Sequence, residues 1–525
     1  MHNIIQTKPL LNTYNTIFVN PQSIYKDLHN YFIKEDIISS LDDDIINPYT
    51  KDWSNIQGYA SLLVQPKSSF ECAIILRACF ENKIPITVSA GKTNLTGSAT
   101  PKGGVVLSIS NLKEPKILVD QIKKEVLSPV GITLETLRDE VLKCTKNKLY
   151  YPVDPTSRHD AYVGGTISCN ASGFIPGERG ATRYWVKEIE LILPCGNYIR
   201  AKRGQYISKE GSFELDINNE QVILPVPKYK RPDIKNASGP YSSENGEIDF
   251  VDLIIGSEGL YGIIISCKLK LEERPKEYLE LFLSLNSEIK AIDFHDFLYN
   301  HFDGKMSKIS ALEYFGYNSQ KYMKHRKFLF KNEQDVGIYI QIPIYHSTID
   351  EKSHKWIELI SKFDNSIDMD NVIVLNDPLN WKKFFEARHS IPDNALSKTR
   401  QLGGISIITD TIVPPKNYRQ YLSLIHEKLQ NANIEYLLFG HLGDCHLHFH
   451  LIPTGKQDEK CMKVYDYMID LSAEFGGVYS AEHGTGKRKR NDFKKCYGSE
   501  AVEMVKQSKL AIDPNLILNR GNVFN

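Results

Sequence analysis

Three glycine-rich stretches divide the first half of the chain, and each lies beside a run of β-forming residues. They are SAGKTNLTGSATPKGG at 89–104, DPTSRHDAYVGGTISCNASG at 154–173 and GSEGLYG at 256–262. Glycine has no Cβ, so such loops let backbone amides approach an anion closely. A single glycine-rich loop is usually only a turn. Three in one region leave two interpretations open, namely plain turns or a cradle for a cofactor that contains a diphosphate.

Two common nucleotide motifs are excluded. The GKT at 91–93 would need a glycine five positions before Gly91 to form a phosphate-binding loop of the triphosphatase type, and Ile86 stands there. The dinucleotide fingerprint G-x-G-x-x-G is also absent, which disfavours a Rossmann domain. A diphosphate cofactor would therefore need a different fold.

Composition limits the class of protein. A chain of 525 residues is too long for one core, and 41% hydrophobic with 24% charged residues is typical of a globular protein. Lys plus Arg and Asp plus Glu are both 64, so a nucleic-acid partner is not expected. No apolar run approaches a membrane span and the start lacks a signal pattern, so we expect a cytoplasmic protein. Nine cysteines without a C-x-x-C disfavour an iron–sulfur cluster or a cysteine zinc site.

Hydrophobic periodicity predicts alternating helices and strands. In the first half we expect a helix at 70–83, strands at 84–90 and 103–110, and a hairpin at 186–201. Residues 203–246 are polar with little periodicity, and predict a long excursion that is partly a binding loop. The second half predicts strands at 336–345 and 435–452 and helices at 415–431 and 456–475. We expect an N-terminal extension (1–50), a cofactor domain (51–274) and a substrate and metal domain (275–525).

The stretch GHLGDCHLHFH at 440–450 holds four of the chain's 15 histidines. In a strand, His446, His448 and His450 would share one face, and the turn at 443–444 would bring His441 towards His448. Two imidazoles need a further ligand, for which Glu482 is a candidate. Such a set would hold a divalent metal, with zinc first and iron(II) or manganese also suitable. The alternative is that Glu482 is an ordinary carboxylate at a helix start.

These motifs together resemble the FAD-linked D-2-hydroxyacid dehydrogenases of the vanillyl-alcohol-oxidase superfamily, a family that includes D-lactate dehydrogenase, the glycolate oxidase flavoprotein subunit and D-2-hydroxyglutarate dehydrogenase. The first stretch is similar to the family's pyrophosphate loop, the second to its Pro-Asp-Pro…Gly-Gly segment and the third to its Gly-Ser-Glu-Gly segment. The match runs from about Asp52 to LNRGNVF at the end. It implies an α+β chain, with a two-part FAD-binding domain of the vanillyl-alcohol-oxidase (PCMH) type followed by an α+β FAD-linked oxidase C-terminal domain.

The resemblance implies a set of FAD contacts in the three loops. They are Gly91, Thr93, Asn94, Leu95, Thr96, Gly97, Pro155, Gly164, Gly165, Ser168, Asn170, Gly173 and Ile263. The chain departs from the family at Ala90, Lys92 and Ser172, where glycines are usual. The first loop has no histidine for a covalent tether, so we expect non-covalent FAD.

The family's Gly-His-x-Gly-Asp-Gly-Asn-Leu-His and Ser-Ala-Glu-His-Gly motifs imply the remaining roles. They place metal ligands at His441, His448 and Glu482 and a catalytic base at His483. His446 stands where relatives usually carry asparagine, beside Cys445 in place of glycine, and would either donate to substrate or crowd the site. Arg388 matches an Arg-His-Ala-Ile-Pro segment and would bind the substrate carboxylate. Lys235 resembles a family lysine near the flavin, which makes it a further catalytic candidate.

The implied reaction oxidises a small D-2-hydroxyacid to the 2-oxoacid. The flavin takes the hydride, His483 takes the proton and the metal polarises the hydroxyl. Relatives that accept a second acidic group carry a lysine where SIITDTIVP (406–414) has isoleucine. This favours D-lactate, then glycolate, over D-2-hydroxyglutarate.

Several alternatives stay open. The chain could be a flavoprotein subunit that works only with iron–sulfur partners, or a D-2-hydroxyglutarate dehydrogenase. A flavin-free metallohydrolase would leave the three glycine loops without a purpose. The electron acceptor could be a quinone, a cytochrome, an electron-transfer flavoprotein or an iron–sulfur subunit, and peripheral membrane association is compatible with the sequence.

Overall fold

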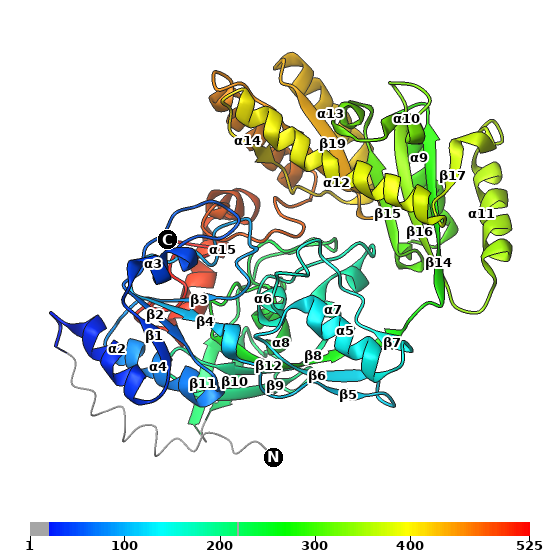
Figure 1. The fold of residues 1–525 in the computed structure, drawn as a ribbon. Helices are drawn as coiled ribbons and strands as arrows, with labels where there is room; N and C mark the ends of the chain where they lie inside the picture. The colour runs from blue at the N-terminus through cyan, green and yellow to red at the C-terminus, as the bar shows by residue number, and fades with distance from the viewer. Residues whose placement is uncertain (1–19, 218–219) are drawn as a thin grey trace.

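Figure 1 shows the computed structural model, which describes residues 20–217 and 220–525. Most of the first half of the chain forms the lower lobe in this view, and a seven-stranded sheet with its helices forms the upper one. Residues 1–19, which belong to the predicted N-terminal extension, lie outside the described residues.

The lower lobe begins with a four-stranded sheet in the order β1-β2-β4-β3. Its strands are β1 (Ile38–Ser40), β2 (Leu62–Gln65), β3 (Ile86–Ser89) and β4 (Val105–Ser108), preceded by α2 (Ile24–Lys34) and α3 (Asp43–Ile46). Both β2 and β3 run parallel to β4, so the chain crosses over between β2 and β3 through α4 (Ser69–Glu81). The predicted helix and both strands are confirmed. The described part of the predicted extension is built onto this sheet, since β1 pairs with β2.

A five-stranded antiparallel sheet forms the second part of this lobe, in the order β5-β6-β12-β8-β9. Its strands are β5 (Leu118–Asp120), β6 (Glu125–Pro129), β8 (Val186–Ile192), β9 (Tyr198–Lys202) and β12 (Ile263–Lys270), with α5 (Leu134–Cys144), α6 (Val163–Ser168), α7 (Thr182–Trp185) and α8 (Phe250–Ile254) between them. The predicted hairpin is β8 paired with β9.

The predicted excursion at 203–246 contains regular structure that we did not expect. Strands β10 (Ser212–Ile217) and β11 (Glu220–Pro225) pair antiparallel within it. Phe213, Leu215 and Ile217 are buried and alternate with polar neighbours. The alternation is visible in the sequence, but it spans only six residues among turn-forming ones.

The upper lobe is built on the sheet β17-β14-β16-β15-β19-β20-β18. Its strands are β14 (Glu277–Leu285), β15 (Ala311–Phe315), β16 (Val336–Ile344), β17 (Val372–Val374), β18 (Ile407–Ile408), β19 (Tyr436–His441) and β20 (His446–Leu451). One face packs against α9 (Glu288–His301), α11 (Ile349–Phe363), α13 (Pro415–Asn431) and α14 (Asp458–Glu474), and the other against α12 (Pro378–Gln401) after α10 (Arg326–Leu329). The strand predicted at 336–345 and the helices at 415–431 and 456–475 are confirmed, and the run predicted at 435–452 forms two strands, β19 and β20, joined by a turn.

The chain returns to the lower lobe at its C-terminal end. Tyr479, Phe493 and Leu518 belong to the same core as the first two sheets, and α15 (Arg490–Leu510, kinked at Gly498) lies against this lobe in Figure 1. The backbone N–H of Ile86 donates to the carbonyl of Ile517. The short pair β7 (Leu149–Tyr150) and β13 (Glu272–Glu273) leads into β14. The domain limits at 274 and 275 stay a prediction, with the added finding that the last segment packs on the first lobe.

Two further sequence expectations concern cysteines and membranes. All nine cysteines lie in the described part of the chain and are free thiols, five of them buried. Within residues 20–217 and 220–525, none of the helices combines the length and apolar character that crossing a bilayer requires.

Candidate active site

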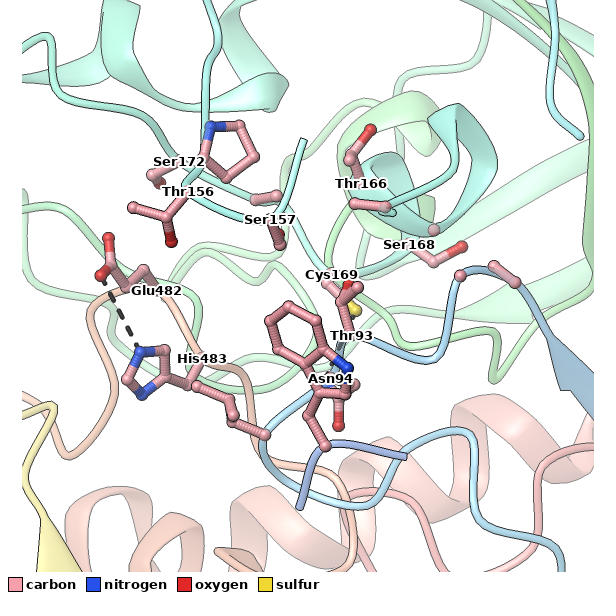
Figure 2. Close-up of a pocket in the computed structure, with 18 of the residues that line it drawn as sticks. Thr93, Asn94, Thr156, Ser157, Thr166, Ser168, Cys169, Ser172, Glu482 and His483 are labelled. Carbon is pink, nitrogen blue, oxygen red and sulfur yellow. Dashed lines mark hydrogen bonds and ion pairs between the residues drawn. The ribbon is translucent and has the colours of Figure 1, made fainter. Parts of the chain in front are cut away.

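One cavity of about 450 Å³ lies between the glycine-rich loops of the lower lobe and the histidine-bearing strands of the upper lobe. All three glycine stretches contribute to its lining, and so do Arg388, His441, His448, Glu482 and His483. Its size is within the range of small-molecule and cofactor sites. Figure 2 shows Glu482 and His483 across the cavity from Thr93, Asn94 and Ser168.

The glycine-rich end is held together by backbone contacts. A Cβ on Gly91 would lie 2.0 Å from the carbonyl oxygen of Asp160, so the first and second loops touch where Gly91 has no side chain. A Cβ on Gly165 would meet only the Cβ of Ala90, at 3.1 Å. Close approach of these two loops therefore needs glycine at position 91, whereas a Cβ at position 165 would require only a small shift of Ala90.

Ten of the predicted FAD contacts line the cavity, namely Gly91, Thr93, Asn94, Leu95, Pro155, Gly164, Gly165, Ser168, Gly173 and Ile263. Thr96, Gly97 and Asn170 do not. The Asn94 side chain accepts from the Thr96 amide, and the Asn170 side chain accepts from the Arg183 amide. Gly97 has a positive φ of 82°. These three residues therefore contribute to the conformation of the loops and do not line the cavity.

The lining fits a polar cofactor such as FAD. Ser172 lines the cavity, and its buried hydroxyl has no hydrogen-bond partner among the described residues. Burying an unpaired hydroxyl costs free energy, which a ligand hydrogen bond would remove. Thr93 and Ser157 also line the cavity and contribute hydroxyl-bearing side chains to it.

The other end of the cavity is centred on Glu482. Its Oε1 lies 3.5 Å from Nε2 of His441, 3.5 Å from Nε2 of His448 and 3.9 Å from Nε2 of His483. The hairpin of β19 and β20 places the first two, because its short turn (Leu442–Asp444) folds the chain back. Two imidazoles and a carboxylate that converge in this way are a donor set suited to a divalent metal.

Each of these imidazoles has its other nitrogen held by an oxygen. Nδ1 of His441 lies 2.6 Å from Oε1 of Glu313, and Nδ1 of His448 lies 3.0 Å from the Thr409 carbonyl oxygen. Nδ1 of His483 lies 3.4 Å from Oδ2 of Asp410. Acceptors of this kind hold the Nδ1–H and leave Nε2 as the free nitrogen, which is usual for histidines that bind metals.

The electrostatics favour a cation at this end. Burial alone would raise the pKa of Glu482, but Lys235 and His441 outweigh it and hold the pKa well below its usual value. Burial would lower the pKa of His441, yet the Glu313 carboxylate raises it to about 9, and His441 with Arg388 lowers the pKa of Glu313 to about 2 despite burial. An ion bound at His441 would displace its Nε2 proton.

The remaining predicted residues are placed as follows. Arg388 lines the cavity, where its Nη2 lies 3.0 Å from Oε2 of Glu313 and its guanidinium stacks on Phe174. Lys235 does not line the cavity, because it is buried behind Glu482, with Nζ 3.1 Å from Oε2 of that residue. His446 also does not line the cavity, and it is fully buried.

Three residues that contact the site residues were not predicted from the sequence. Glu313 joins His441 to Arg388, and Asp410 accepts from the His483 amide at 2.9 Å. Glu258 lines the cavity and accepts from the amides of Thr485 and Gly486. They lie 128, 73 and 227 residues from partners that only the fold brings near. The glutamate in the third glycine stretch was the one available hint.

The sequence matches the models of known protein families. Residues 60–202 match the sequence model of an FAD binding domain, and residues 309–523 match that of FAD linked oxidases, C-terminal domain. Together the two domains cover about two thirds of the chain. The chain belongs to the FAD-linked oxidases. The predicted fold class and the resemblance to the FAD-linked D-2-hydroxyacid dehydrogenases are thereby confirmed, and the chain is an FAD-dependent enzyme of that class.

Relatives span nearly the whole length of this FAD-linked oxidase. A D-lactate dehydrogenase of Anaerostipes hadrus is 28% identical over 92% of this chain and 93% of its own. The glycolate oxidase subunit GlcD of Bacillus subtilis is 24% identical over 95% of this chain and 97% of its own. The crystal structure of a p-cresol methylhydroxylase has a TM-score of 0.67 at 14% identity, covering 97% of this chain and 98% of that one, and so shares its fold.

Proposed function

We propose that this enzyme oxidises a small D-2-hydroxyacid, D-lactate first and glycolate next, to the 2-oxoacid with FAD and a divalent metal. One observation carries the proposal, namely that a single cavity joins the glycine loops to the Glu482 cluster and to Arg388. When bound, FAD would supply a hydride acceptor, and the metal would supply a Lewis acid for the substrate hydroxyl. Zinc, iron(II) and manganese all suit the donor set.

Arg388 would bind and orient the substrate carboxylate. Its planar guanidinium can pair with a carboxylate through two parallel N–H donors. Glu313 contacts only Nη2, and the guanidinium carbon lies 4.6 Å from the centre of the Phe174 ring. The rest of the guanidinium therefore remains for a ligand in the cavity that it lines.

His483 would accept the proton of the substrate hydroxyl. Burial lowers the pKa of His483 to about 4 in spite of the Asp410 carboxylate, so the imidazole is neutral at pH 7 and can take up a proton. Asp410 lies on the Nδ1 side, at 3.4 Å, and would stabilise the protonated ring. The proton would therefore be held at Nε2, on the cavity side.

Lys235 would act through Glu482 as a positioning residue. Its Nζ lies beside Oε2 of Glu482, and Oε1 is the oxygen that faces the histidines. Holding one carboxylate oxygen in this way would leave the other to bind the metal. The catalytic role expected for Lys235 is replaced here by this positioning role, because the side chain does not reach the cavity.

The cavity wall supports a monocarboxylate substrate. Ile408 lines the cavity, and the resemblance implies that it stands where the motif of relatives with a second acidic group has lysine. An isoleucine cannot pair with a second carboxylate, and burying that charge unpaired is costly. This favours D-lactate or glycolate over D-2-hydroxyglutarate.

A second candidate is a flavoprotein subunit that needs iron–sulfur partners. The near full-length match to a glycolate oxidase subunit favours it. The location would be cytoplasmic, with peripheral membrane association if the acceptor is a quinone.

A dye-linked assay of the purified chain tests both candidates. We expect turnover with D-lactate or glycolate and an artificial acceptor, and little with D-2-hydroxyglutarate. Turnover only after a partner subunit is added would favour the subunit candidate, and no turnover with any 2-hydroxyacid in either case would contradict the proposal. Repeating the assay with quinone, cytochrome or electron-transfer flavoprotein would identify the acceptor.

A further inference from the structure

His446 is the main departure of this chain within the histidine motif. It occupies β20 opposite His441 of β19, and its side chain has no solvent exposure. The family motif that this stretch resembles has asparagine at this position, which lacks an imidazole. The question is what a buried histidine does next to the Glu482 cluster.

One nitrogen of His446 is already occupied. Nε2 lies 3.0 Å from Oδ1 of Asp410. A carboxylate oxygen accepts hydrogen bonds, so Nε2 of His446 carries the proton in this contact. Neutral imidazole protonated on Nε2 presents a lone pair on Nδ1.

The other nitrogen has no partner. Nδ1 of His446 is buried and makes no hydrogen bond within the described residues. An unpaired lone pair in the interior costs free energy unless a ligand fills it. The same pattern, with one nitrogen held by an oxygen and the other free, was found at His441 and His448.

His446 also lies close to the other potential metal ligands. His441, His446, His448 and Glu482 each offer a ligand atom, and these four atoms all lie within 4.8 Å of one another. The ring centroid of His446 is 4.6 Å from that of His448 and 5.6 Å from that of His441. His450 lies on the same strand face and also has an unpartnered Nδ1, but it is not part of this group. Proximity to the other donors therefore separates His446 from His450.

We propose that His446 is a fourth protein ligand of the metal, so that this enzyme holds its ion with three imidazoles and one carboxylate. Asp410 supports it as the outer carboxylate, as Glu313 supports His441. The inference rests on the proposed metal dependence and deepens it. A six-coordinate ion held by four protein ligands has about two positions left, which suits a 2-hydroxyacid that offers a hydroxyl and a carboxylate oxygen. Manganese, iron(II) or cobalt(II) would then fit better than four-coordinate zinc.

The test compares metal binding in wild type, His446→Asn and the matched control His450→Asn. Affinity for cobalt(II) is measured by competition with a chelator, and the visible spectrum of the cobalt protein reports its coordination. We expect His446→Asn to lower the affinity about 10- to 100-fold and to change the spectrum. His450→Asn should leave both unchanged. Flavin absorbance and the melting temperature show whether each variant is folded.

A second measurement needs no variant. X-ray absorption of the cobalt-loaded wild type counts imidazole ligands, and we expect three. Two imidazoles, or an unchanged affinity and spectrum in His446→Asn, would overturn the assignment while leaving the proposed function intact. A wild type that binds no cobalt(II), manganese or zinc would instead overturn both the ligand assignment and the proposed metal dependence. This outcome can be distinguished because the control His450→Asn would then bind no metal either.

Discussion

The two ends of the cavity reach the same space by different means. At the glycine end, backbone atoms approach each other. Another residue can stand in place of glycine where the surrounding fold holds it at a positive φ. Lys92 stands at a usual glycine position and keeps a φ of 59°, with Nζ bonded to the Pro48 carbonyl. At the histidine end, every ring has a specific oxygen partner. Substitutions should therefore cause modest losses of cofactor affinity at the glycine end and large losses of activity at the histidine end.

The largest effect is expected for Glu482→Gln. The amide keeps the shape but loses the charge on which the histidines converge, so we expect kcat/KM to fall about 10³-fold. Metal content measured by atomic absorption should fall in parallel, with FAD retained. Glu474→Gln, an exposed change before the same motif, is the control. Full activity in Glu482→Gln would contradict a role for the cluster.

Arg388→Met should come next. Loss of the bidentate donor removes the pairing with the substrate carboxylate, and we expect kcat/KM to fall about 100-fold, mainly through KM. Arg388→Lys should restore part of the loss. Steady-state kinetics give the values, and Arg400→Met, exposed on the same helix, is the control. An unchanged KM would assign substrate binding elsewhere.

Gly91→Ala probes the other end. The added methyl would meet the Asp160 carbonyl, so the two loops must separate, and we expect FAD affinity to fall roughly 10-fold while metal content stays the same. Flavin fluorescence titration of the apoprotein measures the change. Gly403→Ala has open space around it and should lower only stability, because its φ is positive. Equal FAD affinities in both variants would show that the loops are not a cradle.

The last prediction concerns folding stability, with no change expected in the chemistry of the site, and involves Lys487, which contacts the first glycine loop. Its Nζ donates to the Gly97 carbonyl at 3.1 Å, and burial lowers the pKa of Lys487 to about 7. Above pH 7 the unfolded chain binds a proton that the folded chain has lost, so folding stability should rise with pH, by up to about 1.4 kcal/mol per unit, until the lysine of the unfolded chain titrates near pH 10.

Urea unfolding at pH 7, 8 and 9 measures this slope. Lys487→Met should lack the contribution, whereas Lys494→Met, which is exposed, should keep it. If the free energy of unfolding rises equally with pH in wild type and in Lys487→Met, another group is responsible for the pH dependence.

The sequence predicted the histidine end better than its surroundings. Residues such as His441, His448 and Glu482 are rare types in a tight motif, so their spacing indicated chemistry directly. Glu313 and Asp410 are ordinary acids whose importance depends on long-range contacts, and no local pattern reports these. The return of the C-terminal segment to the first core was hidden for the same reason. At the glycine end, Thr96, Gly97 and Asn170 were assigned by motif, and they do not line the cavity.

Anaerobic reduction of the flavin tests most directly whether the two ends form one active site. The purified yellow protein is mixed with D-lactate in a stopped-flow instrument, first loaded with metal and then after chelation, while absorbance near 450 nm is followed. We predict rapid bleaching in the metal-loaded protein, loss of bleaching on chelation, and recovery when a divalent metal is restored. Absorbance that stays constant with every 2-hydroxyacid, or bleaching that is indifferent to the metal, would contradict a single FAD and metal site.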